Sequence, residues 1–97
     1  MRVITKNPLK FFWQIYPKSY SSLDTWYRVA KKAEWDSFDD IKRDFGKRVD
    51  RVGKFTVFDI GGNKYRLIVA IHYNTQRIYV RYVLTHAEYT HGDWKKG

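Results

Sequence analysis

The sequences FTVFDI at residues 55–60, YRLIVAIHY at 65–73 and RIYVRYVL at 77–84 decide the fold of this chain. All three stretches are rich in β-branched and aromatic residues and alternate with a period of two, which is typical of β-strands. Gly-Gly-Asn-Lys at 61–64 and Asn-Thr-Gln at 74–76 separate them, and such residues favour turns. The pattern therefore predicts a three-stranded antiparallel meander.

The alternation also assigns side chains to the two faces of this sheet. A hairpin loop of two or four residues between the last two strands would pair Ile71 with Ile78. One face would then be apolar and the other cationic. The expected apolar face holds Phe58, Ile60, Leu67, Val69, Ile71, Ile78, Val80, Tyr82 and Leu84. The expected cationic face holds Arg66, Ile68, Ala70, His72, Arg77, Tyr79, Arg81 and Val83, with Asp59 beside Arg66.

The residues before the meander predict two to three amphipathic helices, because apolar side chains recur there at helical spacing. We expect these helices to cover the apolar sheet face and to leave the cationic face open, which makes the fold class α+β. Cap residues and prolines place the element ends. The expected elements are a short strand from Arg2 to Thr5, a helix capped by Asn7 that ends before Pro17, a helix from Ser21 or Ser22, and a shorter helix from Ser37 to Phe45 ended by Gly46.

Length and composition predict a single domain spanning residues 1–97. Hydrophobic residues make up 43% of the chain and aromatic residues 19%, which indicates an ordered globular protein. There is no cysteine, so disulfides and thiolate metal sites are excluded, and three histidines are weak grounds for zinc. No stretch resembles a signal peptide or a membrane helix. We expect a cytoplasmic protein that uses no metal and no other cofactor and does not bind membranes.

The positive charge is concentrated in one part of the chain. The formal net charge is +9, and residues 42–66 hold eight basic and three acidic residues, a net charge of +5. Such a patch attracts nucleic acid and accelerates its association. A solvated face and a docking surface for an acidic protein segment are the alternative interpretations.

Thr85-His86-Ala87-Glu88-Tyr89, directly after the last predicted strand, combines an imidazole, a carboxylate and a phenol. Arginine binds phosphate, whereas these three groups transfer protons. RNA can be cleaved without a metal when its 2′-hydroxyl attacks the adjacent phosphorus and arginine stabilises the charge on the phosphoryl oxygens. The candidate catalytic residues are Arg66, His86, Glu88 and Tyr89, and the candidate RNA- or phosphate-binding residues are Lys54, Lys64, Arg77, Arg81 and Tyr79.

Each candidate also has a structural interpretation. His86 is compatible with a surface or capping role, and Glu88 with an acidic position in the first turn of a terminal helix, where it would stabilise the helix dipole. Tyr89 is compatible with packing on the sheet edge. Exposed arginines on strands commonly form cross-strand pairs, and Asp59 offers Arg66 such a partner.

The residues Gly61-Gly62-Asn63-Lys64-Tyr65-Arg66-Leu67 and Thr85-His86-Ala87-Glu88-Tyr89 together resemble the HigB family of bacterial toxin-antitoxin toxins, which has a RelE/ParE-like fold. The resemblance spans nearly the whole chain. It implies an mRNA interferase that acts on messages translated at the ribosome and is held inactive by a HigA-type antitoxin with a helix-turn-helix domain. It further implies that Arg66 binds phosphate and that Tyr89 is an active-site tyrosine, with His86 in the place of a basic residue and Lys54 as a strand lysine.

Two other functions remain open at this point. Toxins of the same superfamily inhibit DNA gyrase without cleaving RNA, so the resemblance also allows a non-enzymatic toxin. The basic composition alone is equally compatible with a plain RNA-binding module, which would bind RNA with a steep salt dependence and leave cell growth unaffected.

Overall fold

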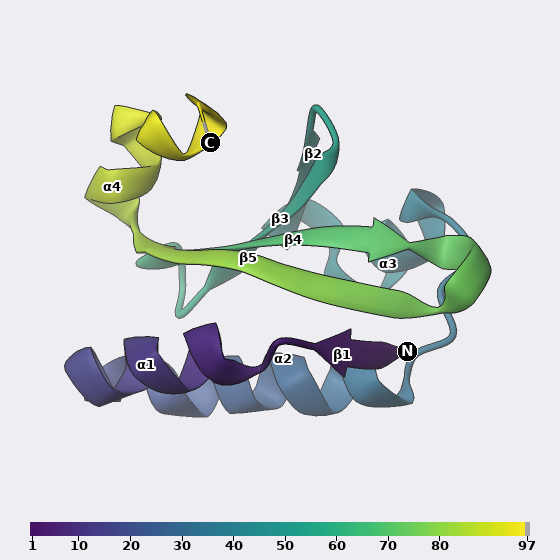
Figure 1. Ribbon diagram of the computed structural model, residues 1–97, viewed down its shortest axis with the longest axis horizontal. Coiled ribbons are helices and arrows are strands. Elements are labelled where there is room, and N and C mark those ends of the chain that lie inside the picture. Colours follow the sequence, from purple (N-terminus) through teal and green to yellow (C-terminus); the bar gives the residue numbers. More distant parts are fainter. Residues whose placement is uncertain (97) are drawn as a thin grey trace.

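The computed structural model describes residues 1–96 and is built around one five-stranded sheet with helices on both faces (Figure 1). The strands are β1 (Arg2–Ile4), β2 (Val49–Val52), β3 (Phe55–Ile60), β4 (Tyr65–His72) and β5 (Arg77–Thr85). Their order in the sheet is β1-β5-β4-β3-β2. Strands β2 to β5 form an antiparallel meander, and β1 pairs with β5 in parallel. The predicted α+β class is confirmed, and so are the short N-terminal strand and the three strands of the predicted meander, each within one residue of its expected ends.

The helices divide between the two faces of the sheet. In Figure 1, α1 (Asn7–Ile15) and α2 (Tyr20–Lys32) lie along one face, whereas α4 (His86–His91) lies on the opposite side. The remaining helix is α3 (Phe38–Phe45), and short 3-10 turns are η1 (Pro17–Ser19), η2 (Gly46–Arg48), η3 (Tyr73–Thr75) and η4 (Asp93–Lys96). Within the described part of the chain, no helix has the length and apolar character needed to span a membrane.

Two predicted helix starts are wrong by one or two residues. Helix α1 begins at Asn7 itself, with Lys6 at the cap position and no side-chain cap hydrogen bond. Helix α2 begins at Tyr20 because the η1 turn runs directly into it, and the Ser19 hydroxyl donates to the Tyr16 carbonyl at 2.7 Å. Helix α3 starts after Ser37 as predicted.

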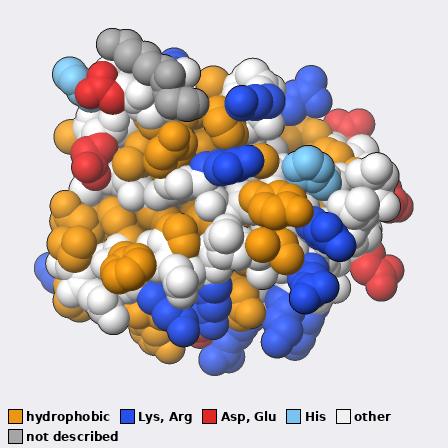
Figure 2. All heavy atoms as spheres, in the orientation of Figure 1, with side chains coloured by type: hydrophobic (Ala, Val, Ile, Leu, Met, Phe, Trp, Pro, Cys, Tyr) orange, Lys and Arg blue, Asp and Glu red, His pale blue; other side chains and the backbone are white. Residues whose placement is uncertain are grey.

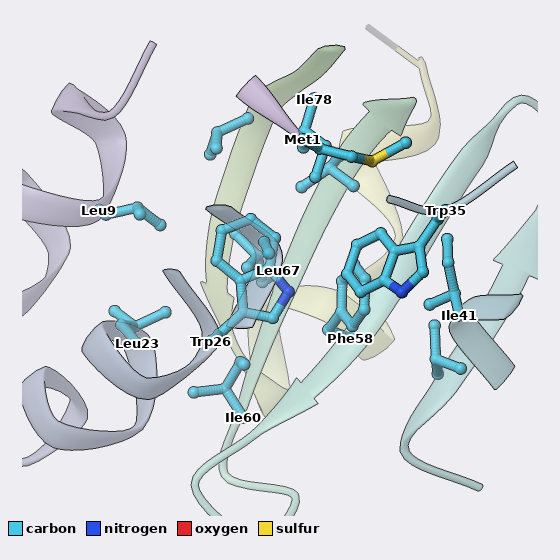
Figure 3. Packing of buried hydrophobic residues seen from close by; sticks show 14 of the residues in the cluster. Met1, Leu9, Leu23, Trp26, Trp35, Ile41, Phe58, Ile60, Leu67 and Ile78 are labelled. Atoms are coloured by element: carbon cyan, nitrogen blue, oxygen red, sulfur yellow. The ribbon is translucent and has the colours of Figure 1, made fainter. Parts of the chain in front are cut away.

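The main core lies between the sheet and the helices α1, α2 and α3 (Figure 3). Leu9, Leu23 and Ile41 from the three helices are completely buried against strand residues such as Phe58 and Leu67. Trp26 contacts Phe58 edge to face, with 5.4 Å between ring centres. Burying a side chain of this size contributes about 1.5–3 kcal/mol, so these contacts fix the sheet on which the site is built.

Strand β2 was not predicted from the sequence. It extends the meander at the edge of the sheet, where Val49 pairs with Phe58 and Val52 with Phe55. Asp50 and Arg51 between these valines are exposed. A short strand with charged residues is typical of a sheet edge and carries little alternation, so the pattern at 49–52 is too weak to distinguish it from a loop.

A β-bulge in β5 overturns part of the predicted face assignment. Val69 pairs with Val80, but Ile68 pairs with Tyr82, so Arg81 is an extra residue between them. The pairing of Ile71 with Ile78 is confirmed, whereas beyond the bulge the faces are exchanged. Val83 packs against the main core, and Tyr82 and Leu84 pack on the other face beside Ile68.

The cationic face is not fully open, contrary to the prediction. Helix α4 and the η4 turn, together called the C-terminal segment, fold back over it. Trp94 is only 5% exposed and forms a second apolar cluster with Val57 and Ile68, which Tyr82, Leu84 and Phe55 border. The indole supplies an apolar contact large enough to hold this short segment on the sheet.

Candidate active site

Arg66 from β4 and Tyr89 from α4 meet on the sheet face that carries the C-terminal segment. The central guanidinium carbon of Arg66 lies 5.2 Å from the centre of the Tyr89 ring, a cation–π contact. Both residues line a cleft of about 420 Å³, called the Arg66/Tyr89 cleft. Its other lining residues are Lys42, Lys47, Val49, Asp50, Val57 and Asp59. The structure therefore brings together two of the four residues predicted to be catalytic.

The guanidinium of Arg66 is held on several sides. Its Nε lies 3.1 Å from a carboxylate oxygen of Asp59, so the predicted pair is confirmed. One terminal nitrogen donates to the carbonyls of Asn63 and Tyr65, each at 3.2 Å, and the other donates to the Asn63 side-chain oxygen. With the side chain only 9% exposed, these contacts fix both the position and the plane of the charge.

The turn between β3 and β4 makes this arrangement possible. Asn63 adopts a positive φ of 79°, a conformation that asparagine tolerates better than most residues. Gly61 has a φ of 63°, and a Cβ added there would lie 3.2 Å from the Tyr65 ring. Gly61 and Asn63 thus favour the turn that places Asn63 against the guanidinium of Arg66.

Tyr89 is positioned by Trp94. Their rings stack with centres 5.3 Å apart and planes inclined by 16°, and the Trp94 indole N–H donates to the Tyr89 carbonyl at 3.2 Å. Burial raises the pKa of Tyr89 above its ordinary 10.0; the nearby Arg66 charge lowers it, and Asp50 and Asp59 raise it. The phenol is therefore protonated at neutral pH and able to donate a hydrogen bond or a proton.

The rim of the cleft carries charges that were not singled out from the sequence. Lys42 at the end of α3, Lys47 in η2 and Asp50 in β2 belong to the basic stretch 42–66, but nothing in that stretch alone indicated which of them face Arg66. Their placement depends on β2 pairing with β3. Recognising β2 would have been the one route to them from the sequence.

His86 and Glu88 do not line the Arg66/Tyr89 cleft. The strand ends at Thr85, and the chain turns there into α4, so His86 is exposed while its backbone N–H donates to the Lys64 carbonyl at 3.0 Å. Glu88 forms a capping box with Thr85. Its carboxylate accepts from the Thr85 N–H at 2.9 Å, and the Thr85 hydroxyl accepts from the Glu88 N–H at 3.2 Å. Catalytic roles for these two residues stay predictions.

The residues predicted to bind RNA are dispersed. Lys54 and Arg81 are exposed and line a second cleft, separate from Arg66 and Tyr89. Lys64 is exposed in the turn before β4, Arg77 is exposed at the start of β5, and Tyr79 contacts His72 edge to face, with ring centres 5.1 Å apart. None of these last three lines either cleft.

The Arg66/Tyr89 cleft combines a fixed cation, a protonated phenol, two lysines and two carboxylates. Donors and charges held in place before a reaction stabilise developing negative charge effectively, because they need no reorganisation. Such a cleft is suited to bind a phosphate group and to donate a proton to an oxygen that leaves it.

Comparisons with known proteins give an independent assignment. Residues 19–92 match the HigB toxin family, described as the RelE-like toxic component of a toxin-antitoxin system. The chain is 30% identical over 92 residues to the mRNA interferase HigB of Escherichia coli O6:H1 (strain CFT073), an alignment that covers 92% of this chain and 88% of the relative. It is 29% identical over 91 residues, with the same coverage, to the mRNA interferase toxin HigB of Escherichia coli (strain K12) and to the mRNA interferase HigB of Shigella flexneri. The chain therefore belongs to the HigB family of RelE-like toxins of toxin-antitoxin systems.

Proposed function

We propose that this protein is an mRNA interferase, a metal-independent endoribonuclease that cleaves mRNA in the Arg66/Tyr89 cleft by attack of the 2′-hydroxyl on the adjacent phosphorus. The observation that carries the proposal is the contact between the fixed Arg66 guanidinium and the protonated Tyr89 phenol. The names of the relatives, all mRNA interferases, support it.

Arg66 would stabilise the charge that gathers on the phosphoryl oxygens. Its contacts with Asp59, Asn63 and Tyr65 account for at most four of the five guanidinium N–H groups, so at least one donor remains for the substrate. Because the side chain is already ordered, little entropy is lost when a phosphate binds. Lys42 and Lys47 on the rim add positive charge for the flanking phosphates.

Tyr89 would act as the acid. Its pKa is raised, so the phenol carries its proton at the pH of the cytoplasm, where we propose the toxin acts. In the reaction the 2′-oxygen bonds to phosphorus, the bond to the 5′-oxygen breaks, and that oxygen takes a proton from the phenol.

The group that removes the 2′-hydroxyl proton is a separate question. Asp50 lines the Arg66/Tyr89 cleft, whereas His86 and Glu88, which the sequence favours, lie outside it on α4. Individual Asp50→Asn, His86→Gln and Glu88→Gln substitutions would identify the base, because only the loss of the base removes the corresponding acidic limb of the pH–rate profile.

We further propose that the message is cleaved at the translating ribosome and that a HigA-type helix-turn-helix antitoxin neutralises the toxin. Membership of a toxin-antitoxin family supports the antitoxin. The net charge of +9 on a domain of 97 residues supports association with the RNA-rich ribosome surface.

Inducing the chain in bacterial cells and mapping RNA ends tests the proposal. We expect growth arrest, new mRNA ends with 2′,3′-cyclic phosphates and 5′-hydroxyls, and unchanged plasmid supercoiling. Growth arrest with intact mRNA and inhibited supercoiling would instead support a gyrase inhibitor, and unaffected growth would support a plain RNA-binding module.

A further inference from the structure

A second cleft of about 450 Å³ opens on the same side of the sheet as the Arg66/Tyr89 cleft. Its lining combines the basic side chains of Lys54 and Arg81, the imidazole of His72 and the aromatic rings of Phe55 and Tyr82. We call it the Lys54/Arg81 cleft. Figure 2 shows Lys and Arg side chains between hydrophobic ones across the middle of the molecule, where β4 and β5 lie.

The β-bulge contributes Arg81 to the lining of this cleft. Arg81 is the extra residue between the pairs Val69–Val80 and Ile68–Tyr82, so it is outside the regular alternation of β5. Bulges often redirect a side chain beside a functional site. Among residues 1–96, the Arg81 guanidinium has no ion pair and no side-chain hydrogen bond, in contrast to the guanidinium of Arg66, which contacts Asp59 and Asn63. Arg81 therefore keeps its donors for a ligand.

The two clefts are linked through one face of β4. Arg66, Ile68 and His72 alternate onto this face, with Arg66 in the first cleft and His72 in the second. Ile68 lies between them in the apolar cluster with Trp94. Ala70 also lines the second cleft. It lies four residues beyond Arg66 on β4, which corresponds to a distance of about 13 Å along the strand. One mononucleotide therefore cannot occupy both clefts, whereas a strand of several nucleotides can.

We infer that the Lys54/Arg81 cleft is a second RNA-binding site, which holds a nucleotide of the substrate strand away from the phosphate that is cleaved. Arg81 and Lys54 bind its phosphate, and the base stacks on the aromatic walls. The combination of basic side chains and aromatic rings favours a nucleotide over an acidic peptide as the ligand, because an acidic peptide would use only the basic side chains. The inference rests on the proposed function, because it takes RNA as the substrate.

The test measures binding of a fluorescent 2′-O-methyl RNA strand of about twelve nucleotides, a length within the range of single-strand binding sites. Lacking a 2′-hydroxyl nucleophile, it is bound and not cut. We expect Arg81→Ala and Lys54→Ala each to weaken binding about 10-fold. Binding of a 2′-O-methyl dinucleotide in the Arg66/Tyr89 cleft should be unchanged.

Arg77→Ala is the matched control, because it removes an exposed arginine from the same strand, at a position that lines neither cleft. Arg77 pairs in register with His72 but lines neither cleft, so Arg77→Ala should weaken strand binding less than Arg81→Ala does. Backbone NMR of the wild-type protein gives a second readout. The strand should shift the amide signals of His72 and Arg81 as well as those around Tyr89.

Four outcomes decide the matter. Weaker strand binding by the Arg81 and Lys54 variants alone supports the second site, even if the wild type cleaves no RNA and the proposed function fails. Cleavage by the wild type with equal strand binding by Arg81→Ala and Arg77→Ala overturns the second site and leaves the proposed function intact. Absence of wild-type strand binding overturns it as well, and so does a polyglutamate peptide that displaces the strand from His72 and Arg81.

Discussion

Arg66 keeps its charge in one place because its neighbours hold the guanidinium before any substrate arrives. Asp59 balances the charge of a side chain that is only 9% exposed, and Asn63 fixes its plane. A buried cation that loses its partner strongly destabilises the folded protein. The ion pair between Arg66 and Asp59 therefore contributes both to the stability of the fold and to the geometry of the cleft.

Asp59→Asn therefore should lower the free energy of unfolding by about 1–3 kcal/mol, because it leaves Arg66 buried without a counter-charge. Chemical denaturation measures this change. Asp24→Asn is the control, since it breaks the exposed pair with Arg28 at 3.0 Å and should cost at most about 0.5 kcal/mol. Equal losses for the two variants would contradict the assigned role of Asp59.

Tyr89 gives a pH dependence whose sign follows from its surroundings. Its pKa is raised above 10.0, so its contribution to stability is complete below pH 10.0 and is lost as the pH rises through the folded-state pKa. The difference in tyrosinate absorbance between the wild type and Tyr89→Phe should show titration above pH 10.0. Arg66→Ala should move that titration higher still, because the Arg66 charge lowers the pKa. Titration of Tyr89 below its ordinary value would refute the acid role.

At the scale of elements, the C-terminal segment matters most. It is short, and Trp94 fixes it by packing on Val57 and Ile68 while stacking on Tyr89. The position of the Tyr89 phenol thus depends on a residue outside the Arg66/Tyr89 cleft.

Trp94→Ala should lower the free energy of unfolding by about 3 kcal/mol and RNA cleavage by about 100-fold, because Tyr89 loses its support. Trp94→Phe retains a stacking ring, loses one hydrogen bond to the Tyr89 carbonyl, and should recover most of the activity. Activity assays at a temperature where both variants are folded separate positioning from stability. Full activity of Trp94→Ala would show that the segment plays no part in positioning Tyr89.

Glu88 at the start of α4 has two possible roles, a structural one in the capping box and a chemical one in proton transfer. Glutamine can replace glutamate in a capping box, so Glu88→Gln should preserve the helix, and we expect cleavage within about threefold of the wild type. Thr85→Ala breaks the box and should cost about 1 kcal/mol of stability. A large loss of activity in Glu88→Gln, with stability unchanged, would instead place Glu88 in proton transfer.

Elements set by local periodicity were predictable, and those set by long-range pairing were not. The alternation in β3 and β4 was strong enough to place Asp59 beside Arg66. Strand β2 is short and holds two charged residues, so its sequence shows no clear alternation. The bulge at Arg81 cannot be recognised from the sequence either, because the residues from Tyr79 to Val83 alternate as in a regular strand. Trp94 stood in a polar tail, so its burial depends on a tertiary contact that local sequence does not encode. For these reasons the sequence could name Arg66 and Tyr89 as candidates, whereas Lys42, Lys47 and Asp50, which line the same cleft, were not singled out.

At the scale of the whole molecule, the two faces of the sheet differ in what they carry. One face binds the helices α1 and α2 through the main core, and the other carries both clefts on either side of the C-terminal segment. The face with the clefts is thus built on strands whose reverse side is packed against the main core, which holds Arg66 in register with its neighbours.

The most direct test of the account is the rate at which Tyr89→Phe cleaves mRNA, compared with Tyr79→Phe as a control. Both variants lose one phenol oxygen from a partly buried tyrosine and keep the ring. If the Arg66/Tyr89 cleft is the active site, Tyr89→Phe should cleave at least about 100-fold more slowly than the wild type, and Tyr79→Phe at nearly the wild-type rate. Cleavage by a folded Tyr89→Phe variant at the wild-type rate would contradict the account.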